Sequence, residues 1–296
     1  MSKENYQLRS QMRTLTDNLV SVLAILATVL VVAPLAAIFG YLVYKGASSL
    51  NLAFFTQIPK PEGESGGGMA NAIVGSGFLL GLASLIGIPL GIGGGIFLAE
   101  FGRGTKLANA VRFTADVLNG VPSIVMGLAV YSLIVSVHSS FIPFSGHFSA
   151  FSGGVALGIM MIPTVCRTTE EMLLMVPHAV REAALGLGVP NWRSVLSITL
   201  KTASPGIITG CMLAFARVAG ETAPLLFTAL GNSFMNANLN EPIEALPLQI
   251  YNYAISPYDD QHRLAWAGAL VLIVLIVLAV SLVRFVTSRG VLKGAS

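Results

Sequence analysis

Long stretches without charge are the feature that most constrains how this chain folds. Five runs contain no Asp, Glu, Lys or Arg, and they cover residues 18–44, 71–99, 117–137, 148–166 and 264–283. A sixth apolar run, residues 205–230, contains only Arg217 and Glu221. A helix of about 20 apolar residues crosses the hydrocarbon core of a bilayer. Charged residues make up only 10% of the chain, against about 25% in a soluble domain. The sequence therefore predicts an all-α membrane protein with six transmembrane helices.

The basic residues predict the orientation of these helices. Lys and Arg concentrate before the first run, between the second and third, between the fourth and fifth, and after the sixth, whereas the remaining loops are mostly acidic. Cytoplasmic loops carry the basic excess, so both termini are predicted to be cytoplasmic. The first run is longer than the apolar region of a cleaved secretory signal, about 7–15 residues. We therefore expect it to remain as a transmembrane helix.

These assignments divide the chain into segments. In order, we predict a cytoplasmic tail, the first transmembrane helix, a periplasmic loop, a five-helix permease domain and a second cytoplasmic tail, at residues 1–16, 17–44, 45–70, 71–284 and 285–296. The domain includes a long cytoplasmic loop, residues 168–204. The outer segment 231–263 is too long for a plain connector. Its apolar residues fit a short helix at the membrane interface or on a partner, and an irregular surface loop remains an alternative.

Glycines at a spacing of four predict a close helix contact. Gly87, Gly91 and Gly95 share one face of the second predicted helix, as Gly77 and Gly81 share another. Small residues at this spacing allow two transmembrane helices to approach closely. A phosphate-binding loop of a nucleotide site would end in Gly-Lys-Ser/Thr, and the chain has no such motif.

Arg217 is the most unusual residue, because it lies near the middle of an apolar run. Each membrane surface would be roughly 18 Å away along a helix, and a lone charge at that depth costs between about 2.5 and well over 10 kcal/mol. Glu221 is four residues on and would share its helix face. The two residues form either a structural ion pair or a charged station on a solute pathway. Gly220, Thr222 and the following Ala-Pro favour a local break that exposes backbone donors to a cavity.

Arg167 follows the fourth run and is the second candidate for such a pathway. It is either an interfacial arginine that sets topology or the inner end of an anion route. The planar guanidinium binds two oxygens of a tetrahedral oxyanion at once. Downstream, residues 173–187 have helical spacing between Pro177 and Gly188. An exposed cytoplasmic helix of this kind is expected to bind in a groove of a partner protein.

The loop also carries a family pattern. Glu182-Ala183-Ala184, then Gly188, Trp192, Leu200 and Pro205-Gly206-Ile207, resembles the cytoplasmic EAA loop of type I ABC importer permeases. The resemblance covers about residues 70–284. It implies that the helix around Arg181, Glu182, Ala183, Ala184 and Gly188 docks on an ATP-hydrolysing subunit. Lys201 stands where the family usually has proline, which leaves the docking interpretation intact.

Three further segments narrow the resemblance. The sequences GGGMANAIVGSG at 66–77, RTTE at 167–170 and ARVAGETAPLLFTALGN at 216–232 resemble permease subunits of the bacterial phosphate-specific ABC importer. The family implies a multi-pass protein of the bacterial plasma membrane. It also implies a second permease, PstC, two copies of the ATPase PstB, and the periplasmic phosphate-binding protein PstS. ATP and Mg²⁺ would bind to PstB, with no cofactor on this chain. Phosphate would pass Arg217, Glu221, Thr222 and Arg167, and Glu221 would accept a hydrogen bond from a protonated phosphate oxygen.

Other functions remain open at this point. The same fold would serve a permease for another oxyanion such as sulfate or molybdate, or a regulatory subunit that senses phosphate without conducting it. A membrane-embedded enzyme would need a nucleophile, metal ligands or acid–base groups at one depth. No catalytic set is evident, and His138, His147, His178 and His262 show no metal-ligand spacing. Cys166 and Cys211 are too few and too apolar in setting for a disulfide framework or a zinc site.

Overall fold

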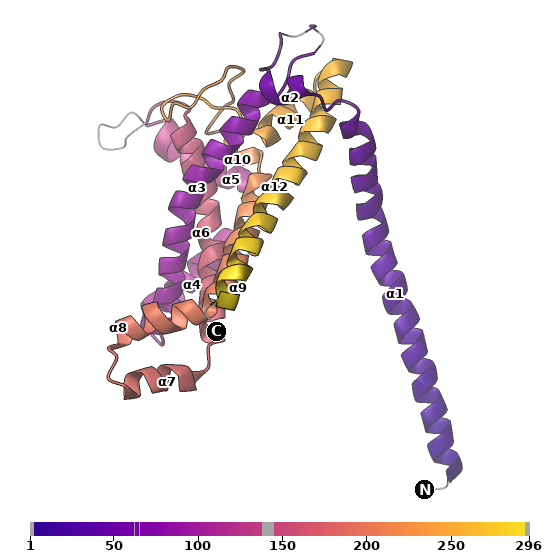
Figure 1. The fold of residues 1–296 in the computed structure, drawn as a ribbon, viewed down its shortest axis with the longest axis vertical. Coiled ribbons are helices and arrows are strands. Elements are labelled where there is room, and N and C mark those ends of the chain that lie inside the picture. Colours follow the sequence, from indigo (N-terminus) through magenta and orange to yellow (C-terminus); the bar gives the residue numbers. More distant parts are fainter. Residues whose placement is uncertain (1–2, 62, 65, 138–144, 294–296) are drawn as a thin grey trace.

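The computed structural model is a bundle of long helices with one helix standing apart (Figure 1). It describes residues 3–61, 63–64, 66–137 and 145–293. Within these ranges five helices are long and apolar enough to cross a membrane, and the number reaches six when one bent pair of helices is counted as a single span. The predicted six spans agree with the structure when that pair is counted as one. No strand occurs in the described part of the chain, where the only β-type contact is an isolated bridge between Leu230 and Ile243.

The helices follow the predicted order. They are α1 (Lys3–Ala47), α2 (Leu52–Thr56), α3 (Ala70–Ile96), α4 (Lys106–Gly120), α5 (Ser123–Val130), α6 (Ala150–Leu174), α7 (His178–Gly186), α8 (Asn191–Ser194), α9 (Leu200–Ala219), α10 (Ala223–Leu226), α11 (Leu246–Ala254) and α12 (Asp259–Lys293). Short π-helical segments extend α3 (Phe97–Phe101) and α5 (Tyr131–Val135), and another (Val195–Thr199) joins α8 to α9. The start of α1 and the end of α12 lie toward the end of the molecule that carries α7 (Figure 1), as the charge distribution predicts.

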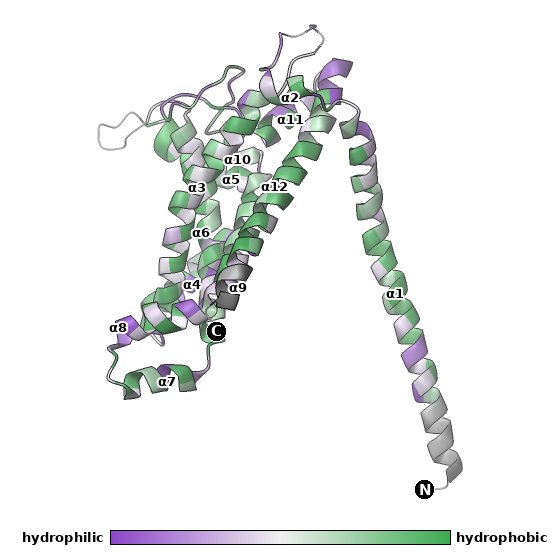
Figure 2. Ribbon diagram, in the orientation of Figure 1, coloured by the Kyte–Doolittle hydropathy of each residue, from purple (hydrophilic) through white to green (hydrophobic). Residues whose placement is uncertain are grey.

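Among the α1 residues whose side chains the structure describes, contact with the bundle is made near the outer end. Tyr41 packs edge-on against Trp266 of α12, with ring centroids 5.3 Å apart, and Gly46 lies beside the backbone of the same residue. The most apolar window of α1 has no residue buried within this chain. Figure 2 shows the hydrophobic colouring along most of its length. Its apolar surface is therefore left for lipid or for another polypeptide.

The core of the bundle is the contact between α3 and α6. A Cβ on Gly91 would lie 2.6 Å from Val165 Cβ, and one on Gly95 would lie 2.5 Å from Thr169 Cβ. Gly87 likewise leaves no room between its Cα and Met161. All three glycines thus lie where α3 approaches α6 too closely for a side chain. Gly77 and Gly81, by contrast, have open space in front of them.

The third predicted span, residues 117–137, is not one helix. Helix α4 ends at Gly120, and the chain turns through 109° before α5 and its extension. Val121 is extended (φ −70°, ψ 131°) and precedes Pro122, which caps α5. A residue before proline is driven out of the helical region, and Gly120 adds flexibility. The expectation of a straight span here was wrong because these residues outweigh the apolar composition.

The fifth predicted span, residues 205–230, is also divided. The membrane-length helix begins earlier, at Asn191, and ends at Ala219. Gly220 closes α9, and the short helix α10 begins at Ala223 with a proline in its first turn. The predicted break at Gly220–Pro224 is confirmed. The expectation that one helix continues through Arg217 and Glu221 is wrong.

The predicted short helix of the outer segment exists as α11, and its first half packs into the bundle. Leu246 and Leu248 are fully buried, and α11 lies against α12 and α3. Ser76 of α3 accepts a 2.7 Å hydrogen bond from the Leu246 amide. The first half of the helix therefore rests on its own chain, whereas Tyr251, Asn252 and Ala254 in its second half are exposed.

Candidate functional site

The two candidate arginines lie on neighbouring antiparallel helices with a fixed register. Gly210 of α9 lies against Thr168 of α6. Beyond the break, Leu225 and Ala229 approach Gly153, where a Cβ would meet them at 3.4 and 3.1 Å. These contacts continue the same register on both sides of Gly220. Arg217 is therefore level with about the middle of α6, and six residues, or roughly 9 Å, outward of Arg167.

Arg217 is exposed near the end of α9. Within the described residues, no side-chain hydrogen bond or ion pair is formed by its guanidinium. It lies level with the middle of α6, because α9 ends at Ala219 within the bundle instead of at its surface. A charged group at this depth needs water, an anion or a protein partner. The open guanidinium is therefore available to a molecule outside this chain.

Glu221 does not pair with Arg217 in the described structure. The predicted pairing required a continuous helix, and α9 ends two residues before Glu221. Glu221 is half-buried and lines a small cavity of about 10 Å³ with Ser76, Leu157 and Pro247. Thr222 turns toward α11, where its hydroxyl donates a long hydrogen bond of 3.5 Å to the Pro247 carbonyl. Both residues thus lie where α9, α10 and α11 meet.

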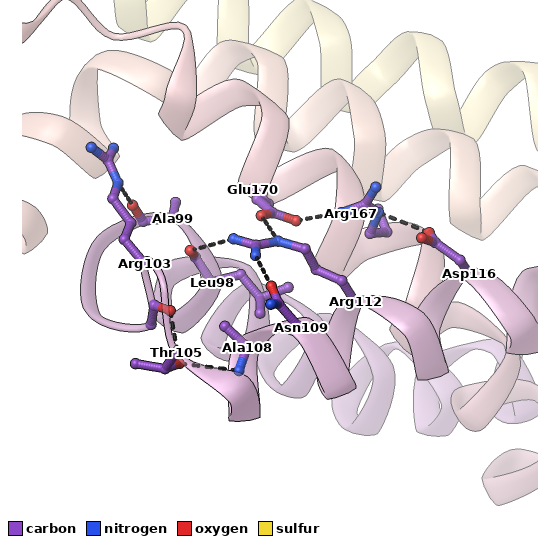
Figure 3. Close-up of polar contacts among 11 residues, drawn as sticks. Leu98, Ala99, Arg103, Thr105, Ala108, Asn109, Arg112, Asp116, Arg167 and Glu170 are labelled. Atoms are coloured by element: carbon purple, nitrogen blue, oxygen red, sulfur yellow. Dashed lines mark hydrogen bonds and ion pairs between the residues drawn. The ribbon is translucent and has the colours of Figure 1, made fainter.

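Arg167 belongs to a charged network between α4 and α6 (Figure 3). Its Nε lies 3.0 Å from Asp116 Oδ1, and its Nη1 lies 2.7 Å from Glu170 Oε2. The other oxygen of Glu170 accepts a 2.6 Å bond from Arg112 Nε. Arg112 also donates to Asn109 Oδ1 and to the Leu98 carbonyl, both at 3.1 Å. Arg167 does not close the span as predicted, since α6 continues to Leu174.

Sequence reasoning did not identify Arg112, Asp116 and Glu170 as site residues. Glu170 is only 3% exposed and bridges two guanidinium groups, which satisfies the charge of a buried carboxylate. Arg112 precedes it by 58 residues. Nothing in that spacing marks the contact, and only the packing of α4 on α6 creates it.

In the cytoplasmic loop, one face of α7 is exposed and the other face contacts the rest of the chain. Helix α7 begins after Pro177, as predicted. Glu182 and Ala183 are exposed, whereas Ala184 is buried against the rest of the loop. Arg181 points inward: its Nη2 lies 2.8 Å from Glu100 Oε1, and it donates to the carbonyls of Val176 and Leu173 at 2.7 Å each. Arg181 therefore holds the loop on the inner end of α3, while Glu182 faces outward.

Gly188 ends this loop helix in the left-handed region, with φ +77°. Its amide donates to the Leu185 carbonyl at 2.9 Å, and the Val189 amide donates to Ala184 at 3.2 Å. Glycine adopts this conformation without the steric cost of a Cβ. The predicted stop signal is confirmed.

A second buried carboxyl lies in the outer segment. Glu244 accepts a hydrogen bond from the Ala245 amide at 3.2 Å and packs beside Gly231. Burial raises the pKa of Glu244 to about 7, and hydrogen bonds from the backbone of Ala245 and Asn232 oppose the shift. This group therefore changes charge near neutral pH.

Metal-binding side chains do not gather in the described residues, where no group of three or more His, Cys, Asp or Glu could hold an ion. His147 lies 2.6 Å from Asn240 Oδ1, and His138 lies outside the described residues. Cys166 and Cys211 are buried and free.

Comparison with known proteins identifies the family. Residues 91–290 match the family described as "Binding-protein-dependent transport system inner membrane component". The "Phosphate transport system permease protein PstA" of Yersinia pestis is 47% identical over 83% of this chain and 81% of its own. The protein of the same name from Haemophilus influenzae is 44% identical over 95% of this chain and 96% of its own. The chain belongs to the PstA family.

The solved structures agree on the fold. The inward-facing MetNI methionine ABC transporter covers 76% of this chain and 96% of its own, with a TM-score of 0.56 at 20% identity. This PstA-family chain is thus a transport permease with the type I ABC importer fold, and a multi-pass protein of the inner membrane. An ABC importer permease works with a separate ATPase and further subunits.

Proposed function

We propose that this chain carries inorganic phosphate inward across the bacterial plasma membrane by alternating access, as one permease subunit of an ATP-driven importer. The observation that carries the proposal is the open guanidinium of Arg217, half-way along the bundle at a helix break, in a chain whose relatives are named phosphate transport permeases. Lipid cannot hydrate an anion, so fixed positive groups must replace its water. They must also bind it weakly enough to release it.

The two arginines would act in sequence. Phosphate would meet Arg217 first, near Glu221 and Thr222, and then Arg167 about 9 Å further in. At the break, the amides of Gly220 and Glu221 donate back to the carbonyls of Arg217 and Val218, so the positive charge of the first station comes from the guanidinium. Asp116 and Arg167 are 56% and 30% exposed, and charged groups this open are expected to face water or a partner instead of hydrocarbon. Both stations therefore fit an aqueous route.

This chain has an exposed surface for each of the remaining subunits. We place the second permease, PstC, along the exposed apolar face of α1 and the open side of Arg217. The exposed Glu182–Ala183 face of α7 would dock on one of two copies of the ATPase PstB, which would bind ATP and Mg²⁺. The outer loops would receive phosphate from PstS. The inward anchor formed by Arg181 and Glu100 would transmit movement of α7 to α3.

Flux in liposomes tests the proposal. The four-protein complex should take up radiolabelled phosphate only with ATP, and Arg217→Ala should abolish uptake while the complex still assembles. Arg217→Lys keeps the charge but loses the planar fork, so we expect partial uptake. If sulfate or molybdate proves to be the transported anion, the substrate assignment is wrong. If the variant cannot assemble, Arg217 has a structural role.

Two neighbouring glycines test the docking surface. Gly188→Ala forces a side chain into the left-handed region, whereas Gly186 lies in a helix, and neither position has an atom within 4 Å of an added Cβ. Gly188→Ala should therefore weaken retention of the ATPase or its coupling to transport, and Gly186→Ala should not. If the two variants retained the ATPase and coupled it to transport equally well, the assignment of this loop as the docking surface would be wrong.

A further inference from the structure

The network at the inner end of α4 and α6 holds its two carboxylates in unlike ways (Figure 3). Glu170 is 3% exposed and accepts from two guanidinium groups, at 2.6 and 2.7 Å. Asp116 is 56% exposed and has one contact, at 3.0 Å, with Arg167 Nε. Arg112 approaches Glu170 and not Asp116. Arg167 thus has one fixed and one exposed partner.

This difference decides which partner can be displaced. Two short, charge-assisted bonds at a buried carboxylate hold Glu170 in place, and withdrawing it would leave buried charge unpaired. A single exposed ion pair contributes little to stability and exchanges readily with water or other ions. Two arginines and two carboxylates make the network neutral. When Asp116 moves away, one unit of positive charge remains on the exposed side of Arg167.

We propose that Asp116 is the exchangeable counter-anion of Arg167 and thereby determines how tightly phosphate is held at the inner end of the route. Between transport events, the Asp116 carboxylate is paired with the guanidinium of Arg167. It yields to phosphate that arrives from the direction of Arg217, and its return displaces phosphate toward the cytoplasm. The inference rests on the proposed function.

The physical reason is competition for one guanidinium. Phosphate presents several oxygens and fits the planar fork of arginine better than one carboxylate oxygen does. A permanently open Arg167 would therefore retain phosphate, and transport requires release. A tethered carboxylate lowers the affinity without blocking the site. Glu170 keeps Arg167 in position throughout.

The test measures phosphate binding to the permease–ATPase complex in lipid nanodiscs, without the periplasmic binding protein and without ATP. Asp116→Asn should bind radiolabelled phosphate about three- to fivefold more tightly than the wild type, the size expected when one exposed ion pair no longer competes. Uptake by the complete importer at saturating phosphate should slow, because release becomes slower. Asp116→Glu keeps the carboxylate and should restore wild-type affinity.

Two controls separate this effect from a general change of charge. Asp260→Asn removes a comparable exposed ion pair, 2.9 Å from Arg263 and far along the chain, and should leave binding unchanged. Adding Arg167→Gln to Asp116→Asn should abolish the gain. Gel filtration and basal ATPase activity establish assembly, and Asp116→Ser serves as a second variant if the asparagine does not assemble.

Several outcomes would overturn the inference. These are unchanged affinity in Asp116→Asn, a gain that survives Arg167→Gln, a gain shared by Asp260→Asn, or binding that is undetectable in every form. In each of these cases ATP-driven uptake by the wild type would still support the proposed function. If the wild-type importer carried another oxyanion instead of phosphate, that result would contradict the proposed function.

Discussion

Arg167 and Arg217 lie on adjacent helices about 9 Å apart in depth, yet their surroundings are opposite. Arg167 is held by Asp116 and Glu170, and Arg112 secures the second of these. Arg217 is exposed at the end of α9, with no partner in the described part of the chain. The same contrast recurs in the cytoplasmic loop, where Arg181 pairs with Glu100 and Glu182 faces outward.

The comparison teaches that a buried and fully paired charge such as Glu170 holds helices together, whereas exposed charges such as Arg217 and Asp116 are open to molecules outside the chain. A buried ion pair is weak evidence for net stability, but removing one partner is costly. An open charge contributes little to the fold. Substitutions in the two classes should therefore fail in different assays.

The largest effect should separate Glu170 from Arg217. Glu170→Gln leaves Arg112 and Arg167 short of a carboxylate in a buried position, which we expect to destabilise the chain by about 3–5 kcal/mol. Arg217→Ala should leave stability within about 0.5 kcal/mol and still abolish uptake. Thermal unfolding of the purified complex together with phosphate flux measures both. A destabilised Arg217→Ala would break the comparison.

The next effect concerns the loop. Arg181→Ala removes an ion pair and two bonds to carbonyls, so α7 should lose its position, which faster proteolysis or hydrogen exchange of residues 176–190 would reveal. Glu182→Ala should leave exchange unchanged and weaken ATPase retention several-fold, because its side chain is exposed. Identical exchange in both variants would contradict the separate roles assigned to neighbouring residues.

A third effect concerns helix packing alone, without any charged group. It tests whether a close contact between α3 and α6 contributes to stability. Gly91→Ala places a Cβ 2.6 Å from Val165 Cβ, so α3 and α6 must separate, at a cost of about 1–3 kcal/mol. Gly93→Ala meets nothing within 4 Å and serves as the matched control on the same helix. The melting temperature should fall only for Gly91→Ala. Because Gly→Ala by itself raises helix propensity, an equal fall for both would show that the close contact at Gly91 is not the cause.

The last effect is confined to a change of pH and concerns Glu244, a buried carboxyl without a cationic partner within the described residues. Its pKa rises from 4.5 to about 7, so the folded state favours the protonated form. The stability that this proton contributes is complete below pH 4.5 and is lost as pH rises to about 7, by at most about 3 kcal/mol.

Glu244→Gln should therefore flatten the decline in melting temperature between pH 5 and pH 8. Glu241→Gln is the control, because Glu241 is exposed in the same segment and bound by Asn236 and Asn238. If Glu244→Gln keeps the wild-type pH dependence, another group is responsible.

Much of the fold could be predicted because its signals are local. Uncharged length gives the number of spans, and basic residues indicate their orientation. Pro177 and Gly188 mark the two ends of the cytoplasmic helix. The four-residue glycine spacing identified the contact face of α3, and the run from Gly220 to Pro224 identified the break. Each of these effects acts through a few neighbouring residues.

The predictions were wrong where the structure depends on a change of chain direction or on contacts between residues distant in sequence. Pro122 was inside an apolar run, and its 109° bend was missed because apolar composition was taken as continuity. The pairing of Glu221 with Arg217 assumed a helix that ends at Ala219. Arg112 and Asp116 were not identified, although both belong to the ion-pair network that includes the predicted Arg167.

The sequence by itself determined a six-span permease, its family pattern, and an arginine at mid-depth, because hydrophobic length, helix breakers and motif spacing are written along the chain. Only the tertiary structure decided which charges are satisfied. That depends on α4 crossing α6, which brings Arg112 to Glu170 across 58 residues, and on α9 ending where Arg217 remains open. Ion pairs form between groups close in space, and no local pattern encodes that proximity.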